Sequence, residues 1–154
     1  MTTSVSTGLP VIDVTDLRLL ATQLKAADPE SAAQLRVGLR AAGQLVADEA
    51  KARASWSTKI PGSVSVSTYG VGVKVKAGGP KAPMAKAFEH GGVAGTFNHP
   101  VYGNATGGKA TGPWVKQNAR PFLGPALAAK GQDVETAVID SLRGGLRALG
   151  LDLS

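Results

Sequence analysis

The chain has 154 residues, a length that suits one compact domain, and 43% of them are hydrophobic, which is enough for a core. It has no cysteine, so disulfides, thiolate metal sites and a cysteine nucleophile are excluded. The formal net charge is +6, which permits contact with nucleic acid or an acidic protein surface. Residues 1–9 are uncharged and lack an apolar core, and no apolar run approaches the ~20 residues that span a bilayer. We therefore expect synthesis in the cytoplasm with no secretory signal and no membrane span.

The first third of the chain predicts two helices. Residues 1–12 are expected to form an extended arm, followed by a short helix over about residues 13–27. A longer helix is expected over about residues 29–54. Asp28 can accept hydrogen bonds from its first amides, and Pro29 fits the first helical position, where no donor is needed. One face of this helix carries apolar residues at helical spacing, namely Leu35, Leu39, Ala42, Val46 and Ala50.

Two glycines interrupt the long helix. Gly38 and Gly43 each weaken it by up to ~1 kcal/mol relative to alanine. Because small residues let another backbone approach closely, we expect tight packing on a neighbour, either in the same chain or in another copy.

A β-hairpin is predicted next. Two segments alternate in polarity, SVSVST at residues 63–68 and VGVKVK at residues 71–76, with Tyr69-Gly70 as the tight turn. Two strands alone are barely stable in water, so a third strand or a helix must cover them. Further strands are expected near residues 97–102 and 114–118. A solvated strand face is the simplest interpretation of the loose basic cluster of Lys74, Lys76, Lys81 and Lys86.

The remaining segments alternate between loops and helices. Residues 84–90 fit a short helix or turn, and residues 103–112 (GNATGGKATG) fit a mobile loop. Residues 121–130 begin a helical segment. A stronger helix is predicted over residues 132–149, with apolar side chains every three or four residues at Val134, Val138, Leu142, Leu146 and Leu149.

This order of elements favours an α+β fold. A long N-terminal helix and a C-terminal amphipathic helix would pack on a small antiparallel β-sheet with long loops. We divide the chain into an N-terminal arm with a short helix at residues 1–28 and a single α+β domain at residues 29–150.

Motifs for catalysis or cofactor binding do not stand out. Glu89, His90 and His99 would be the ligands of a zinc site, but their spacing is not that of a His-Glu-x-x-His helix. Histidines at a turn or an interface are the simpler interpretation. No Gly-x-Ser-x-Gly elbow and no phosphate-binding loop are present, and Glu89 is the only acidic residue between residues 50 and 132. We therefore expect no enzyme activity, no metal and no cofactor.

Aromatic residues gather in a segment that glycine and proline interrupt. Residues 97–123 contain Phe97, Tyr102, Trp114 and Phe122. A core position is the simplest interpretation of Phe122 and Trp114, because a domain with few aromatics uses those it has. Tyrosine and tryptophan also suit partly buried contact surfaces, and a glycine-rich loop can order on contact with a partner. A docking surface is therefore the alternative interpretation of this segment.

The order of motifs resembles a known family. After the long helix come FEHGG at residues 88–92, FNHPVYG at residues 97–103, WVKQ at residues 114–117 and ARPFL at residues 119–123, with PAL at residues 125–127 and a closing amphipathic helix. This order is similar to that of the small neck proteins of long-tailed bacteriophages, in particular those that infect actinobacteria. These are called head-to-tail connector, tail-completion or phage morphogenesis proteins. The resemblance covers residues of about 30–150.

The resemblance implies a structural virion protein that forms a ring, commonly hexameric, between the capsid connector and the tail. Its partners would be further copies of itself, the neighbouring neck proteins and the tail terminator or tail tube. Packaged double-stranded DNA would pass through the lumen without sequence-specific contact. Assembly would take place in the host cytoplasm. The resemblance also implies folding and assembly roles, not catalysis, for Phe88, Glu89, His90, Phe97, His99, Tyr102, Trp114, Arg120, Pro121 and Phe122.

Three alternatives remain open from the sequence. The first is a tail terminator, also a ring, which caps the tail tube. The second is a basic nucleic-acid-binding protein, whose affinity would depend steeply on salt. The third is a hydrolytic enzyme that uses His90 and His99.

Overall fold

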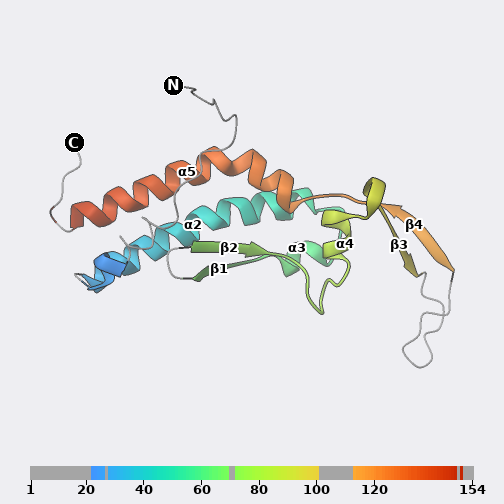
Figure 1. Cartoon of the computed structure of the whole chain (residues 1–154), viewed down its shortest axis with the longest axis horizontal. Helices are drawn as coiled ribbons and strands as arrows, with labels where there is room; N and C mark the ends of the chain where they lie inside the picture. The colour runs from blue at the N-terminus through green and yellow to red at the C-terminus, as the bar shows by residue number, and fades with distance from the viewer. Residues whose placement is uncertain (1–21, 27, 70–71, 101–112, 149, 151–154) are drawn as a thin grey trace, which may run out of the picture.

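The computed structural model describes residues 22–26, 28–69, 72–100, 113–148 and 150. Two long helices lie side by side and run in opposite directions, and a β-hairpin lies against one of them (Figure 1). A second hairpin projects from one end of this body (Figure 1). The α+β class predicted from the sequence is confirmed, with one difference, because the strands form two separate two-stranded sheets and not one.

The central helix, α2, spans Pro29–Arg53. Asp28 caps it as predicted, since its side chain accepts a hydrogen bond from the Glu30 amide at 3.1 Å and another from the Ser31 hydroxyl. Every member of the predicted apolar stripe is buried. Of the shorter helix expected before it, residues 22–26 are helical and Leu24 is buried, while the rest of residues 1–28 lies outside the described residues apart from Asp28.

The closing helix, α5, spans Leu123–Ala148. The two helical segments expected at residues 121–130 and 132–149 are therefore one helix, and Gly131 does not interrupt it. Pro125 lies in its first turn, where a missing amide donor leaves no intrahelical bond unmade. The predicted stripe packs against α2 with Val138 buried and Val134 and Leu142 partly buried.

The small residues of α2 contact other elements of the same chain. A Cβ atom on Gly38 would overlap the Ser141 side chain of α5, and one on Gly43 would overlap a Val73 methyl group. The sequence left open whether the close neighbour belongs to the same chain or another copy. In the structure both close neighbours belong to the same chain: α5 lies against Gly38, and the first hairpin lies against Gly43.

The first hairpin pairs β1 (Ser65–Tyr69) with β2 (Gly72–Lys76). It follows a short helix, α3 (Ile60–Ser63), which was not predicted. Tyr69 pairs with Gly72, so the connection consists of residues 70 and 71, which lie outside the described residues, and the predicted turn is displaced by one position. The apolar side of the hairpin packs on α2, which supplies the cover that two strands need.

The second hairpin, which we call the β3–β4 arm, pairs β3 (Thr96–Pro100) with β4 (Trp114–Asn118). Both strands were predicted, but not their separation from the first hairpin. The short helix α4 (Ala85–His90) and a 3-10 turn, η1 (Val93–Gly95), lead into the arm. Residues 101–112, which include Tyr102 and the glycine-rich loop, lie outside the described residues.

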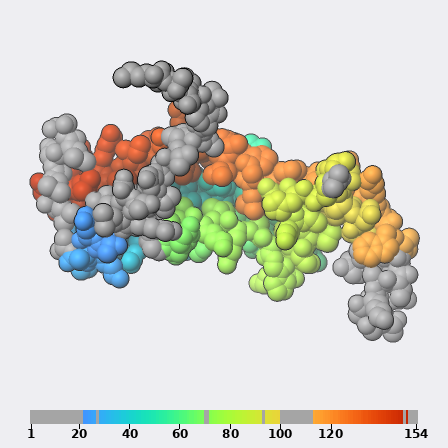
Figure 2. Space-filling view, in the orientation of Figure 1, coloured from blue at the N-terminus to red at the C-terminus, as the bar shows by residue number. Residues whose placement is uncertain are grey.

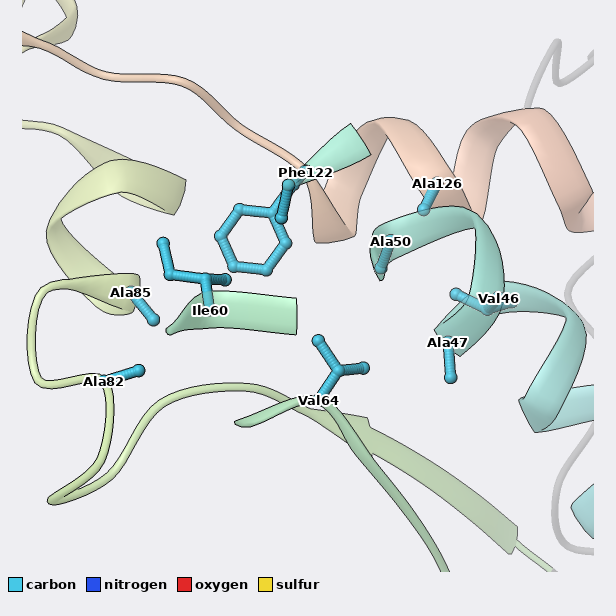
Figure 3. Packing of buried hydrophobic residues seen from close by; sticks show 10 residues of the cluster. Val46, Ala47, Ala50, Ile60, Val64, Ala82, Ala85, Phe122 and Ala126 are labelled. Atoms are coloured by element: carbon cyan, nitrogen blue, oxygen red, sulfur yellow. The ribbon is translucent and has the colours of Figure 1, made fainter. Parts of the chain in front are cut away.

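Two buried clusters form the core. One, near the start of α2 and the end of α5, contains Leu35, Leu39 and Val138. The other lies near the arm and is built around Phe122, which is completely buried (Figure 3). Its ring points toward Ile60, and Ala50 of α2 lies on the other side of the ring (Figure 3). The arm therefore projects from the end of the two-helix body that contains this second cluster (Figure 1).

Candidate functional site

The junction between the body and the arm is organised by Glu89, at the end of α4. Its carboxylate accepts hydrogen bonds from the backbone amides of Phe122 at 2.7 Å, Leu123 at 2.8 Å and Gly124 at 2.7 Å. These are among the first amides of α5, which have no partner within their own helix. An acidic side chain at this position also complements the helix dipole. Glu89 thus caps α5 from a distant part of the chain.

The environment of Glu89 favours its ionised form. Burial alone would raise the pKa of this carboxyl group. Hydrogen bonds from the three backbone amides, together with the charge of His90, act against burial and hold the pKa below its ordinary value. The group is therefore a charged acceptor at neutral pH, which suits a cap and not a general acid.

Backbone hydrogen bonds hold the base of the arm. The Arg120 amide donates to the Phe88 carbonyl of α4 at 2.9 Å, and the Ala119 amide donates to the Gly95 carbonyl at 2.7 Å, next to the paired ends of β3 and β4. Gly91 has a φ of 59°, and a Cβ atom there would lie 2.9 Å from the Ala119 side chain. This position needs glycine both for its left-handed backbone and for the close approach of the second chain segment.

A row of ring contacts continues from the body into the arm. The Arg120 guanidinium lies 5.4 Å from the centre of the Trp56 ring. Trp56 lies 4.6 Å from Phe88, and Phe88 meets Phe97 edge-on at 5.0 Å, centre to centre. Phe97 in turn lies 6.2 Å from His99 on the same strand. Such contacts favour one orientation of the arm relative to the body.

The outer part of the arm leaves apolar side chains in solvent. Trp114 is 64% exposed and its neighbour Val115 is 43% exposed. Adjacent residues of a strand point to opposite faces, so both faces of the arm are apolar there. The predicted core position of Trp114 is therefore wrong. Among the described strands, β4 pairs only with β3, and no described helix packs extensively against it.

The expected site residues divide into two groups. Phe88, Glu89, Arg120 and Phe122 meet at the junction, with the exposed Pro121 between the last two. His90 ends α4, while Phe97, His99 and Trp114 belong to the arm. Among the described residues, no group of three metal-ligating side chains comes together.

Sequence reasoning missed Trp56. It lies just beyond α2 and joins the arginine to the phenylalanines of the junction. The signal available was a lone tryptophan within three residues of the end of an amphipathic helix. That position did not reveal which distant rings it contacts.

Comparison of the chain with models of known protein families, with curated proteins and with solved structures gave no match. In the described segments, no helix combines the length and apolar character that crossing a membrane requires.

Proposed function

We propose that this chain is a structural subunit of a ring in the neck of a long-tailed bacteriophage, where it joins the capsid connector to the tail. The order of motifs over residues of about 30–150 supports this proposal through the family resemblance. The subunit acts by binding its neighbours and not by catalysis.

The observation that carries the proposal is the exposed β3–β4 arm (Figure 2). Two-stranded sheets are marginally stable unless another surface covers them. The first hairpin has α2 as its cover, whereas the outer arm has an exposed tryptophan and an exposed valine on opposite faces. In a ring, the next subunit supplies the missing cover.

A closed ring of identical subunits needs two different surfaces on each copy. The arm is one of them. The glycine face of α2 cannot be the other, because α5 and the first hairpin already occupy it. Apolar side chains that remain exposed on the two long helices are the candidates for the receiving surface, namely Val37, Leu45, Leu127 and Ile139.

Native mass spectrometry of the full chain, alone and mixed with isolated tails or capsids, tests this proposal. We expect a closed oligomer that forms either in the free protein or on a virion part. The double variant Trp114→Ser, Val115→Ser should remain folded, with the wild-type melting temperature, and should lose the oligomer. Tyr69→Ser is the matched control, because Tyr69 is 59% exposed and belongs to the other hairpin.

Two outcomes would count against the proposal. A wild-type chain that stays monomeric with both tails and capsids is not a neck subunit. If the double variant assembles as well as the control, the arm is not part of the interface between subunits. Binding to isolated tail tubes but not to capsid connectors would identify the ring as a tail terminator.

A further inference from the structure

The positive charge of this chain is concentrated in one region. The helices α2 and α5 are nearly balanced, with four basic and three acidic residues in the first and three of each in the second. Between the helices, the only acidic residue is Glu89, and α5 uses it as a cap. The basic residues described in this region are Lys59, Lys74, Lys76, Lys81, Lys86, Lys116 and Arg120.

The first hairpin arranges two of these lysines on one flat surface. Val66 and Val73 face α2, since both lie near the position of a Cβ atom on Gly43. Side chains alternate along a strand, so the neighbouring positions face away from α2. The strand register then sets Ser67 opposite Lys74 and Ser65 opposite Lys76. We call these four residues, together with Tyr69, the outer hairpin face.

The lysines of this face are not neutralised by the described chain. The ion pairs of the described residues lie within α2 and α5, and none involves Lys74 or Lys76. Both lysines are exposed. At the end of the hairpin, the Tyr69 ring lies across Gly72, where a Cβ atom would approach it to 2.7 Å. The face therefore presents hydroxyl and ammonium donors with no carboxylate among them.

These side chains fit a phosphate backbone better than a protein partner. The cores of protein interfaces are depleted in lysine and serine, and Tyr69, at the end of the hairpin, is the one aromatic residue of this face. Contacts to phosphates come from lysine, serine and tyrosine side chains. A second copy is also a poor partner, because neither long helix is strongly acidic. With one tyrosine and no row of aromatics, the face lacks the stacking platforms that single strands use.

We infer that the outer hairpin face binds the phosphate backbone of duplex DNA without reading its sequence. Lys74 and Lys76 neutralise phosphates, and Ser65 and Ser67 donate hydrogen bonds to them. Residues on the same side of a strand are about 6.7 Å apart, so the donors form a short row and not a pocket. This surface is distinct from the arm, and its action does not require a ring.

Fluorescence anisotropy with a labelled random-sequence duplex, titrated with the full chain at several salt concentrations, tests the inference. The variant Lys74→Gln, Lys76→Gln should bind about tenfold more weakly at about 50 mM salt. The slope of log affinity against log salt should fall by about 2, roughly one for each phosphate that the variant no longer neutralises. Affinity should not change when the duplex sequence is changed.

Arg36→Gln, Arg40→Gln is the matched control, because both arginines are exposed on α2 and the double variant removes the same charge. The control should keep the wild-type slope. If both double variants bind the duplex equally weakly, the loss of affinity comes from the lower net charge and not from this face, and the inference is overturned. A wild-type chain that does not bind the duplex at low salt would also overturn it, as would one that binds polyglutamate as tightly with the same dependence on Lys74 and Lys76. The oligomeric state is measured in the same samples, so that loss of DNA binding can be told apart from loss of ring assembly.

Discussion

The Glu89 carboxylate lies 2.7 Å from the backbone amide of Phe122, 33 residues further along the chain. Phe122 is at the same time the largest fully buried side chain of the core. The hydrogen bond between these two residues thus marks the start of α5, and the Phe122 side chain at that point enters the core. The position of the arm follows from this pair, because both of its strands connect to the body beside it.

Replacing Glu89 with alanine should destabilise the protein by about 1–3 kcal/mol. The change leaves the amides of Phe122, Leu123 and Gly124, at the start of α5, without their charged acceptor, and the effects of removing helix caps and charge-assisted hydrogen bonds are of this size. Urea denaturation followed by circular dichroism measures the effect. The control is Asp140→Ala, which removes an exposed ion pair with Arg143. It should change stability by less than about 1 kcal/mol, and a similar destabilisation in both variants would contradict the capping role.

The stabilising effect of Glu89 should depend on pH in a defined direction. Its folded-state pKa is below the ordinary value of 4.5, so its contribution is complete above that value and disappears as pH falls through the folded-state pKa. The difference in unfolding free energy between wild type and Glu89→Gln should be constant over roughly pH 6 to 8 and shrink below about pH 4.5. A difference that persists unchanged at the lowest pH at which both proteins fold would exclude ionised Glu89 as its source.

Two glycine-to-alanine substitutions in helices should have opposite effects. Gly38→Ala places a methyl group against Ser141 and should destabilise by about 1–3 kcal/mol through overpacking. Gly144→Ala meets no atom within 4 Å and should stabilise by about 0.5–1 kcal/mol through helix propensity. Thermal and urea unfolding compare the two. Stabilisation by both substitutions would show that α2 and α5 are not in close contact at Gly38.

Removing the Phe97 ring should loosen the arm more than the body. Phe97→Ala breaks the edge-on contact with Phe88 and the contact with His99. We expect faster hydrogen exchange at residues 96–100 and 114–118, with little change in α2, because local opening exposes only the weakly covered sheet. Asn98→Ala, a position on the same strand outside the row of rings, is the control. Uniform acceleration throughout the chain would mean that the arm does not open separately.

Local sequence signals predicted most of the fold. Asp28 followed by Pro29 defined the start of α2, and the alternation of valines defined the first hairpin. The packing partner of each strand was not predictable, since nothing local distinguishes a strand that joins an existing sheet from one that pairs separately. Trp114 illustrates this difficulty, because its apolar ring suggested burial while its position in the arm leaves it exposed.

The candidate site was predictable only as a set of residues. For the motifs containing Glu89 and Phe122, the family resemblance implied folding and assembly roles but no contact between them. That a carboxylate would cap a helix 33 residues away follows from tertiary structure, because α5 begins without a serine, threonine, aspartate or asparagine of its own at the cap. The role of Trp56 could not be predicted locally either, because its partners Phe88 and Arg120 are distant in the sequence. The docking role of residues 103–112 stays a prediction, since they lie outside the described residues.

The pairing of α2 with α5 has a consequence for folding on the ribosome. The apolar face of α2 is covered chiefly by an element that is complete only when Ala148 has been synthesised. Most of the stability of a protein helix comes from tertiary packing of its apolar face and not from helix propensity. During most of translation, Leu35 and Leu39 therefore lack the cover of α5, since Val138 of the same cluster lies 99 residues beyond Leu39. Such long-range closure slows folding and leaves the nascent chain prone to aggregation until the last helix emerges.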